Sequence, residues 1–251
     1  MKEFTLLILA HILGDYYLQP NWLAKLKERS FLGLLLHSLI YAGMMFAALF
    51  LYYSRYFLYG IIVAAVTHAA IDTAKHIYLN GRHSGERKAK AERNAFFVDQ
   101  ALHFAIILLV SFLSAAYASD AHCPRFIQEI FPRLRDFDFF FMLASSALLL
   151  GAMKPANLAV SKLLGGVLPG DPSASAPIGA LVGSAERLIC AVLIINGELF
   201  CAVFIPAVKA MLSLRAVKDP REAKRCLTGS LLSFAYLLLL YGALRAFGTL
   251  C

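Results

Sequence analysis

VAAVTHAAIDTAK, residues 63–75, joins the two features that decide the fold: an apolar run and a His/Asp pair four residues apart. The same combination recurs in LILAHILGDYYLQ (7–19) and, in reversed order, in AFFVDQALHFAII (95–107). Four residues make about one turn of an α-helix, so both members of a pair lie on one helix face. The spacing therefore predicts apolar helices that carry an imidazole and a carboxylate together. The pairs are His11/Asp15, His68/Asp72 and Asp99/His103.

The composition is that of a membrane protein. Of the 251 residues, 60% are hydrophobic and 16% are charged, whereas soluble domains average about 45–50% and about 25%. Apolar runs long enough to cross a bilayer as helices recur, without the alternation of β-barrel strands. The sequence predicts an all-α, polytopic helical membrane protein. We expect about eight membrane-embedded segments, at residues 4–23, 31–53, 57–79, 95–118, 137–163, 178–195, 198–213 and 229–248.

Basic residues set the expected topology. They cluster in the short loops after segments one, three and seven, which the positive-inside rule assigns to the cytoplasm, with both termini outside. The net charge of +8 is explained by these loops and does not indicate nucleic-acid binding. This orientation requires two crossings within 178–213, where Asn196-Gly197 is a turn signal. Each half is short for a span, so a re-entrant hairpin is the alternative.

We expect three parts along the chain. These are an N-terminal four-helix membrane unit with the His/Asp motifs (1–118), an extracytoplasmic loop (119–136) and a C-terminal membrane unit (137–251). The first segment has no small-residue cleavage site and carries polar pairs, so we expect a span rather than a signal peptide. The five Cys form no CxxC pair, so we expect neither a disulfide framework nor a Cys-based zinc site.

The topology predicts that the polar intramembrane residues share one depth. An Asp at a helix centre costs about 2.5–3.5 kcal/mol on insertion scales, so three of them need compensation. A divalent metal, zinc or else manganese or magnesium, would supply it, in a one-metal or a two-metal centre. The alternatives are a proton relay and polar clamps between helices. The candidate metal ligands are His11, Asp15, His37, His68, Asp72, Asp99 and His103.

The candidate catalytic residues are the carboxylates, because one that does not bind the metal can act as a general base. They are Asp15, Asp72 and Asp99, and the candidate substrate-binding residues are Gln19, Lys75, Glu186 and Arg187. Lys75 either binds a phosphate or extends to the inner interface. Glu186-Arg187 is either a buried ion pair or a polar substrate wall, and Lys154 is a candidate partner of Glu186. We expect Gln100 to point away from Asp99 and to pack against another helix.

Four motifs carry a family resemblance: HILGDYYLQPNWLAKLK (11–27), LLLHSLIY (34–41), THAAIDTAK (67–75) and VDQALHF (98–104). They resemble a bacterial family of multi-pass membrane proteins known only as domain of unknown function 3307. IGALVGSAERL, PAVKAML and TGSLLSFAYLL extend the likeness to most of the chain. The resemblance implies a multi-pass protein of the bacterial inner membrane and no particular activity. A vaguer likeness exists to membrane-bound hydrolases built on intramembrane His and Asp.

Together these observations predict an inner-membrane, metal-dependent enzyme. We expect a hydrolase of a lipid or lipid-linked ester or phosphoester, with membrane lipid as its partner and no nucleic acid. The alternative is a transporter or a proton- or cation-coupled carrier that uses the same His/Asp residues. A third reading is a non-catalytic membrane scaffold. The sequence assigns no oligomeric state.

Overall fold

The structure, a computed structural model, describes residues 1–80, 85–117, 129, 136–167, 177–216 and 220–250. Across these ranges the regular structure is helical and no strand is formed, which confirms the all-α prediction. Five helices in this part of the chain are long and apolar enough to cross a membrane, judged by length and composition. They are Phe31–Phe50, Arg55–Asn80, Arg87–Ala116, Asp138–Gly165 and Ala223–Phe247. The predicted extracytoplasmic loop 119–136 lies outside the described residues except at its positions 129 and 136.

The chain forms two compact units. The first comprises Met1–Ala144 with Leu244–Thr249, and the second comprises Ser145–Ala243. Helices α7 (Asp136–Gly151) and α11 (Pro220–Phe247) begin in one unit and end in the other.

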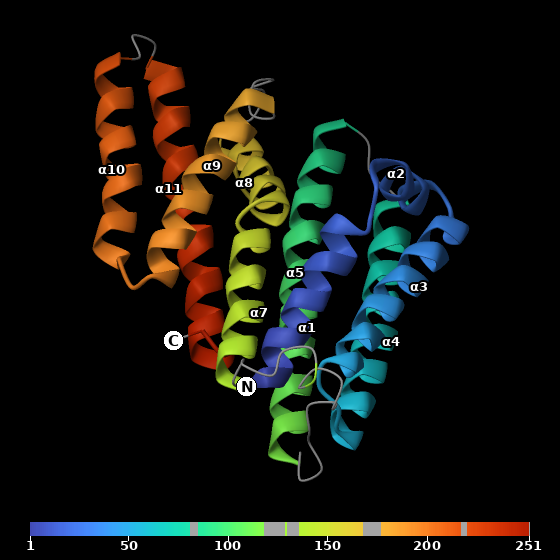
Figure 1. Cartoon of the computed structure of the whole chain (residues 1–251). Coiled ribbons are helices and arrows are strands. Elements are labelled where there is room, and N and C mark those ends of the chain that lie inside the picture. Colours follow the sequence, from blue (N-terminus) through green and yellow to red (C-terminus); the bar gives the residue numbers. More distant parts are fainter. Residues whose placement is uncertain (81–84, 118–128, 130–135, 168–176, 217–219, 251) are drawn as a thin grey trace. The chain divides into compact units, whose positions relative to one another are not determined.

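The first unit is built around α1 (Lys2–Ile12), which is buried along its length from Glu3 onward. It packs against α3 (Phe31–Ala47) and α5 (Gly85–Ala116), and α4 (Arg55–Asn80) packs along both of those helices (Figure 1). A 3-10 turn, η2 (Ala48–Phe50), ends α3. A helix as apolar as α1 is stable in this central place because its side chains meet other helices on all sides.

The predicted first segment, 4–23, is not one straight helix. After α1 the chain forms a π-helical turn, η1 (Leu13–Tyr17), in which Leu18 N donates to Leu13 O at 2.8 Å. Pro20 then lies in extended backbone and starts a separate helix, α2 (Asn21–Arg29). Proline lacks an N–H and has a fixed φ, which explains why the helix stops before it and why a new one starts after it.

The second unit contains α8 (Lys154–Val167), α9 (Pro177–Ile195) and α10 (Leu199–Ala216). The predicted segment 137–163 is broken at Ala152–Met153, just before the Lys154-Pro155 step, where proline cannot continue the α-helical hydrogen bonds. Helices α9 and α10 pack against each other and are joined at the predicted Asn196-Gly197 turn. Gly197 turns the chain between them with φ +85°, a conformation that glycine adopts without a steric penalty.

Candidate metal centre

The first unit brings the seven predicted ligands together. They come from four segments: His11 and Asp15 from α1 and η1, His37 from α3, His68 and Asp72 from α4, and Asp99 and His103 from α5. The ring centroids of His68 and His103 lie 4.4 Å apart, those of His11 and His103 5.4 Å, and those of His11 and His68 6.3 Å. The spacing argument therefore identified side chains that converge from segments far apart in sequence.

Four ligand atoms form the tightest group, which we call site 1: His37 Nε2, His68 Nε2, Asp15 Oδ1 and Asp72 Oδ2. His37 Nε2 lies 3.1 Å from His68 Nε2, 3.1 Å from Asp15 Oδ1 and 3.3 Å from Asp72 Oδ2. His68 Nε2 lies 3.2 Å from Asp72 Oδ2 and 4.0 Å from Asp15 Oδ1. Tetrahedral zinc with bonds of about 2.0–2.1 Å has ligands about 3.3–3.4 Å apart. Four of these distances, 3.1–3.3 Å, are close to that spacing, and the fifth, between His68 Nε2 and Asp15 Oδ1, is longer.

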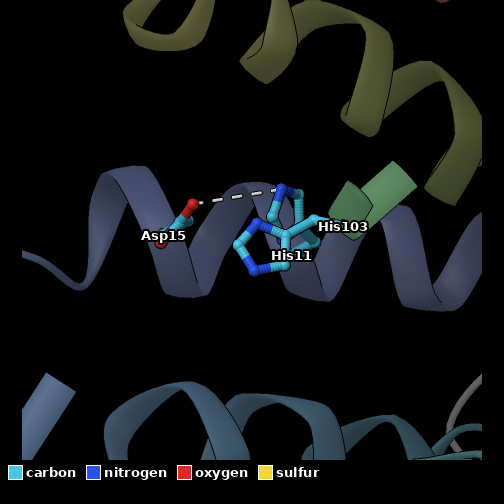
Figure 2. Close-up of side chains that lie close together, drawn as sticks. All are labelled: His11, Asp15 and His103. Carbon is cyan, nitrogen blue, oxygen red and sulfur yellow. Dashed lines mark ion pairs between the residues drawn. The ribbon is translucent and has the colours of Figure 1, made fainter. Parts of the chain in front are cut away.

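A second group, site 2, consists of His11, Asp15 and His103, whose ligand atoms all lie within 4.8 Å of one another. Figure 2 shows His11 and Asp15 on one helical segment with His103 beside them, and its dashed line joins His11 Nε2 to Asp15 Oδ2 over 4.0 Å. His68, Asp72 and His103 form a third such group. Asp15 therefore belongs to both site 1 and site 2, and His103 connects them.

Several of these buried atoms have no hydrogen-bond partner among the described residues. They are Nδ1 of His37, Nδ1 of His68, Oδ1 of Asp99, and both ring nitrogens of His103. His103 is only 2% exposed. A buried polar group without a partner costs about 1–3 kcal/mol, so this arrangement fits residues that hold a ligand.

Two lysines pair with the carboxylates. Lys75 Nζ lies 2.8 Å from Asp99 Oδ2, so the predicted substrate-binding lysine contacts the centre. Lys27 Nζ lies 2.6 Å from Asp72 Oδ2, a contact that the sequence analysis missed because it assigned Lys27 to a loop. Helix α2 carries this ammonium group onto the centre.

Gln100 is a further member that the sequence analysis left out. It faces another helix, as predicted, but the prediction that it points away from Asp99 is wrong, because its amide donates to that carboxylate as well as to Asp15. Its Nε2 donates to Asp15 Oδ2 (3.3 Å) and to Asp99 Oδ2 (3.2 Å), and its Oε1 accepts from the Tyr16 hydroxyl (2.8 Å). The sequence did offer a signal for this role, because Gln100 precedes His103 by three residues and positions three apart lie on neighbouring parts of one helix face.

Tyr41 also contributes from α3. Its ring stacks on His68 with the centroids 3.5 Å apart, and its hydroxyl lies 3.2 Å from His11 Nδ1. Gly14 permits this approach, since a Cβ there would meet Tyr41 Cδ2 at 3.0 Å. Tyr41 therefore orients two of the imidazoles, as outer-sphere partners of metal ligands do.

The other predicted substrate-binding residues have different surroundings. Gln19 is half-buried just after η1. Glu186 and Arg187 are in the second unit. Glu186 forms an ion pair with Lys209, whereas Arg187 donates its hydrogen bonds to other groups, so the first of the two predicted readings, an ion pair between Glu186 and Arg187, is not the one that their described contacts favour.

Arg187 is buried among neutral partners. Its Nε donates to Ala152 O at 2.6 Å, and its terminal nitrogens donate to Ser233 and Asn157. These bonds join α9 to α11 and to the start of α8, so Arg187 has the contacts of an interhelical connector.

The described cluster is thus a buried set of imidazoles and carboxylates with the composition of a divalent-metal site. No curated protein and no solved structure gives a significant match to the chain. The model of a family described as "Protein of unknown function (DUF3307)" matches residues 4–128, the range that holds all seven of these ligands. The N-terminal half of the chain, with its His/Asp cluster, belongs to the DUF3307 family.

Proposed function

We propose that this protein is a metal-dependent hydrolase of a lipid or lipid-linked ester or phosphoester. The observation that carries the proposal is site 1, where two imidazole nitrogens and two carboxylate oxygens lie 3.1–3.3 Å apart in four of their pairs, close to the spacing of a tetrahedral ion's ligands. Three of the helices that supply the cluster, α3, α4 and α5, are also candidate membrane spans. A substrate that reaches such a site through lipid is itself lipid-like.

The buried polar atoms without hydrogen bonds favour this proposal over a scaffold. Polar clamps between helices are hydrogen-bonded, because an unsatisfied polar group in an apolar setting is costly. Here both nitrogens of His103 and one oxygen of Asp99 are buried without a hydrogen bond among the described residues, although His103 Nδ1 and Asp99 Oδ1 lie 3.8 Å apart. These atoms are better explained as groups that meet an ion, a water molecule or a substrate.

The residues divide into separate roles. A bound divalent ion supplies Lewis acidity and an activated water. Asp99 Oδ1 lies outside site 1 and is unpartnered, so it is the carboxylate best suited to accept a proton as general base. Its other oxygen is fixed by Lys75 and Gln100, which holds the carboxylate in one orientation.

The two lysines favour an anionic substrate group. Lys27 and Lys75 each reach a carboxylate of the cluster, from α2 and from α4. A phosphoryl or carboxyl group bound at the metal would compete for these ammonium groups, and their charge would stabilise the additional negative charge of the transition state. We therefore rank phosphoesters above neutral esters.

The experiment is an assay of the purified protein with phosphatidic acid, phosphatidylglycerol and a polyprenyl pyrophosphate in mixed micelles, followed by mass spectrometry of the products. We expect metal-dependent cleavage of one of these probes, its loss in His37→Ala and Asp72→Asn, and its retention in the matched control His76→Ala. Cation- or proton-driven flux in proteoliposomes without any cleaved product would instead support the carrier, for which the adjacent imidazoles would be the relay.

A further inference from the structure

We infer that the centre holds two divalent ions bridged by the carboxylate of Asp15. The inference rests on the proposed metal site and not on the hydrolytic reaction. Asp15 Oδ1 faces His37 and His68, whereas Asp15 Oδ2 faces His11 and Gln100. One carboxylate thus presents an oxygen to each of sites 1 and 2.

The dimensions fit a binuclear centre. Two-metal hydrolytic sites hold their ions about 3.5–4 Å apart, a separation that a bridging carboxylate spans. The imidazoles of the two sites are correspondingly close, with the His68 and His103 ring centroids 4.4 Å apart. His103 forms part of a ligand group on either side, with His11 and Asp15 and with His68 and Asp72.

The two sites differ in completeness, which indicates different roles. Site 1 has four protein ligand atoms, the number of a closed tetrahedral site. Site 2 has three, His11, Asp15 and His103, and so leaves a position for water or substrate as catalytic ions do. Asp99 Oδ1 borders site 2, because it lies 3.8 Å from His103 Nδ1, and it accepts no hydrogen bond from the described residues. It could therefore accept a proton from a water molecule bound at site 2.

Local backbone structure supports a special role for Asp15. It is the middle residue of the π-helical turn η1. π-turns occur frequently at functional sites and widen the helix by one residue in a turn. The widened turn lets the Asp15 carboxylate reach α3 and α4 with one oxygen while the other stays near His11.

A second ion requires anionic ligands in addition to those of the protein. With neutral imidazoles, the carboxylates of Asp15, Asp72 and Asp99 and the ammonium groups of Lys27 and Lys75 leave the centre with one negative charge. Two divalent ions would make it positive by three, which a hydroxide and an anionic substrate group would offset. The inference therefore strengthens the preference for phosphoesters.

The test is manganese reconstitution of the detergent-purified full chain, read by metal content and electron paramagnetic resonance. We expect two Mn²⁺ per chain with an exchange-coupled spectrum in the wild type and in the control His76→Ala. His103→Ala should keep one ion and give an uncoupled six-line spectrum, and Asp15→Asn should lose the coupling.

One Mn²⁺ per chain at saturation, or two without coupling, would overturn the inference. Since a variant that fails to insert is uninformative, His103→Ala is counted only if it elutes as a monodisperse particle, and the wild-type result decides by itself. A coupled pair without hydrolysis of any probe would refute the proposed reaction alone. Hydrolysis with a single ion would refute the bridge alone.

Discussion

Asp72→Asn tests the metal ligands through thermal stability. The Asp72 carboxylate lies 3.2 Å from His68 Nε2 and 3.3 Å from His37 Nε2, so its loss removes one of four ligands at site 1 while keeping the side-chain size. Loss of even an outer-sphere partner weakens metal binding about 10–100-fold, and we take about 100-fold for a direct ligand.

The magnitude follows from mass action. At a zinc concentration about 100 times its Kd, the wild type gains about 2.7 kcal/mol, whereas a variant with a 100-fold higher Kd gains only about 0.4 kcal/mol. For a chain of this size 1 kcal/mol corresponds to about 2–4 °C in Tm, so zinc should raise the wild-type Tm by about 5–11 °C and the variant's by about 1 °C.

The assay is differential scanning fluorimetry of detergent-purified protein with and without zinc. His76→Ala is the control, because its imidazole contacts Asn80 near the end of α4 and belongs to none of the three ligand groups. Equal zinc-induced shifts in Asp72→Asn and wild type would refute the assignment of Asp72 as a ligand. If a variant that lacks both Asp72 and His68 still showed the wild-type zinc-induced shift in Tm, site 1 as a whole would be refuted.

Three further changes give separate predictions. Lys27→Met should tighten zinc binding at site 1 by about 2–5-fold in isothermal titration, because it removes a cation that competes with the metal for Asp72; unchanged or weaker binding would argue against that competition. Gly33→Ala should lower stability by about 1–3 kcal/mol and reduce hydrolysis, since its Cβ would lie 2.4 Å from the Leu26 carbonyl carbon and displace α2; a wild-type Tm would show that α2 tolerates the shift. Arg187→Lys should lower the free energy of unfolding by about 1–3 kcal/mol, and with it the Tm, because guanidinium hydrogen bonds are lost, and it should leave the metal content unchanged; a loss of metal would mean that Arg187 supports the centre as well.

The sequence was sufficient to predict the all-α class and the convergence of the candidate ligands, because both follow from local spacing. An apolar run indicates a buried or membrane-embedded helix. A four-residue His/Asp spacing places both side chains on one helix face, whatever the position of that helix in the fold. His11, His68 and His103 met as expected for this reason. The interruptions were harder to foresee, since the runs around Pro20 and Pro155 continue to look apolar on both sides.

Lys27 shows what spacing cannot predict. Its contact with Asp72 depends on α2 folding back against α3, where Gly33 lets the two backbones approach closely. That approach is a tertiary feature, and a basic residue in a polar stretch is ordinarily a solvated loop residue. The lack of an ion pair between Glu186 and Arg187 has a similar origin, because neighbouring helix positions point about 100° apart and each finds its partner on another helix.

The central claim, that the His/Asp cluster binds a divalent metal, is tested most directly by zinc-edge X-ray absorption together with the metal content of the gently purified protein. The account predicts stoichiometric metal with nitrogen and oxygen neighbours at about 2.0–2.1 Å, and its loss in His68→Ala. Sulfur neighbours at about 2.3 Å, or a wild type that neither carries nor takes up zinc or manganese, would contradict it.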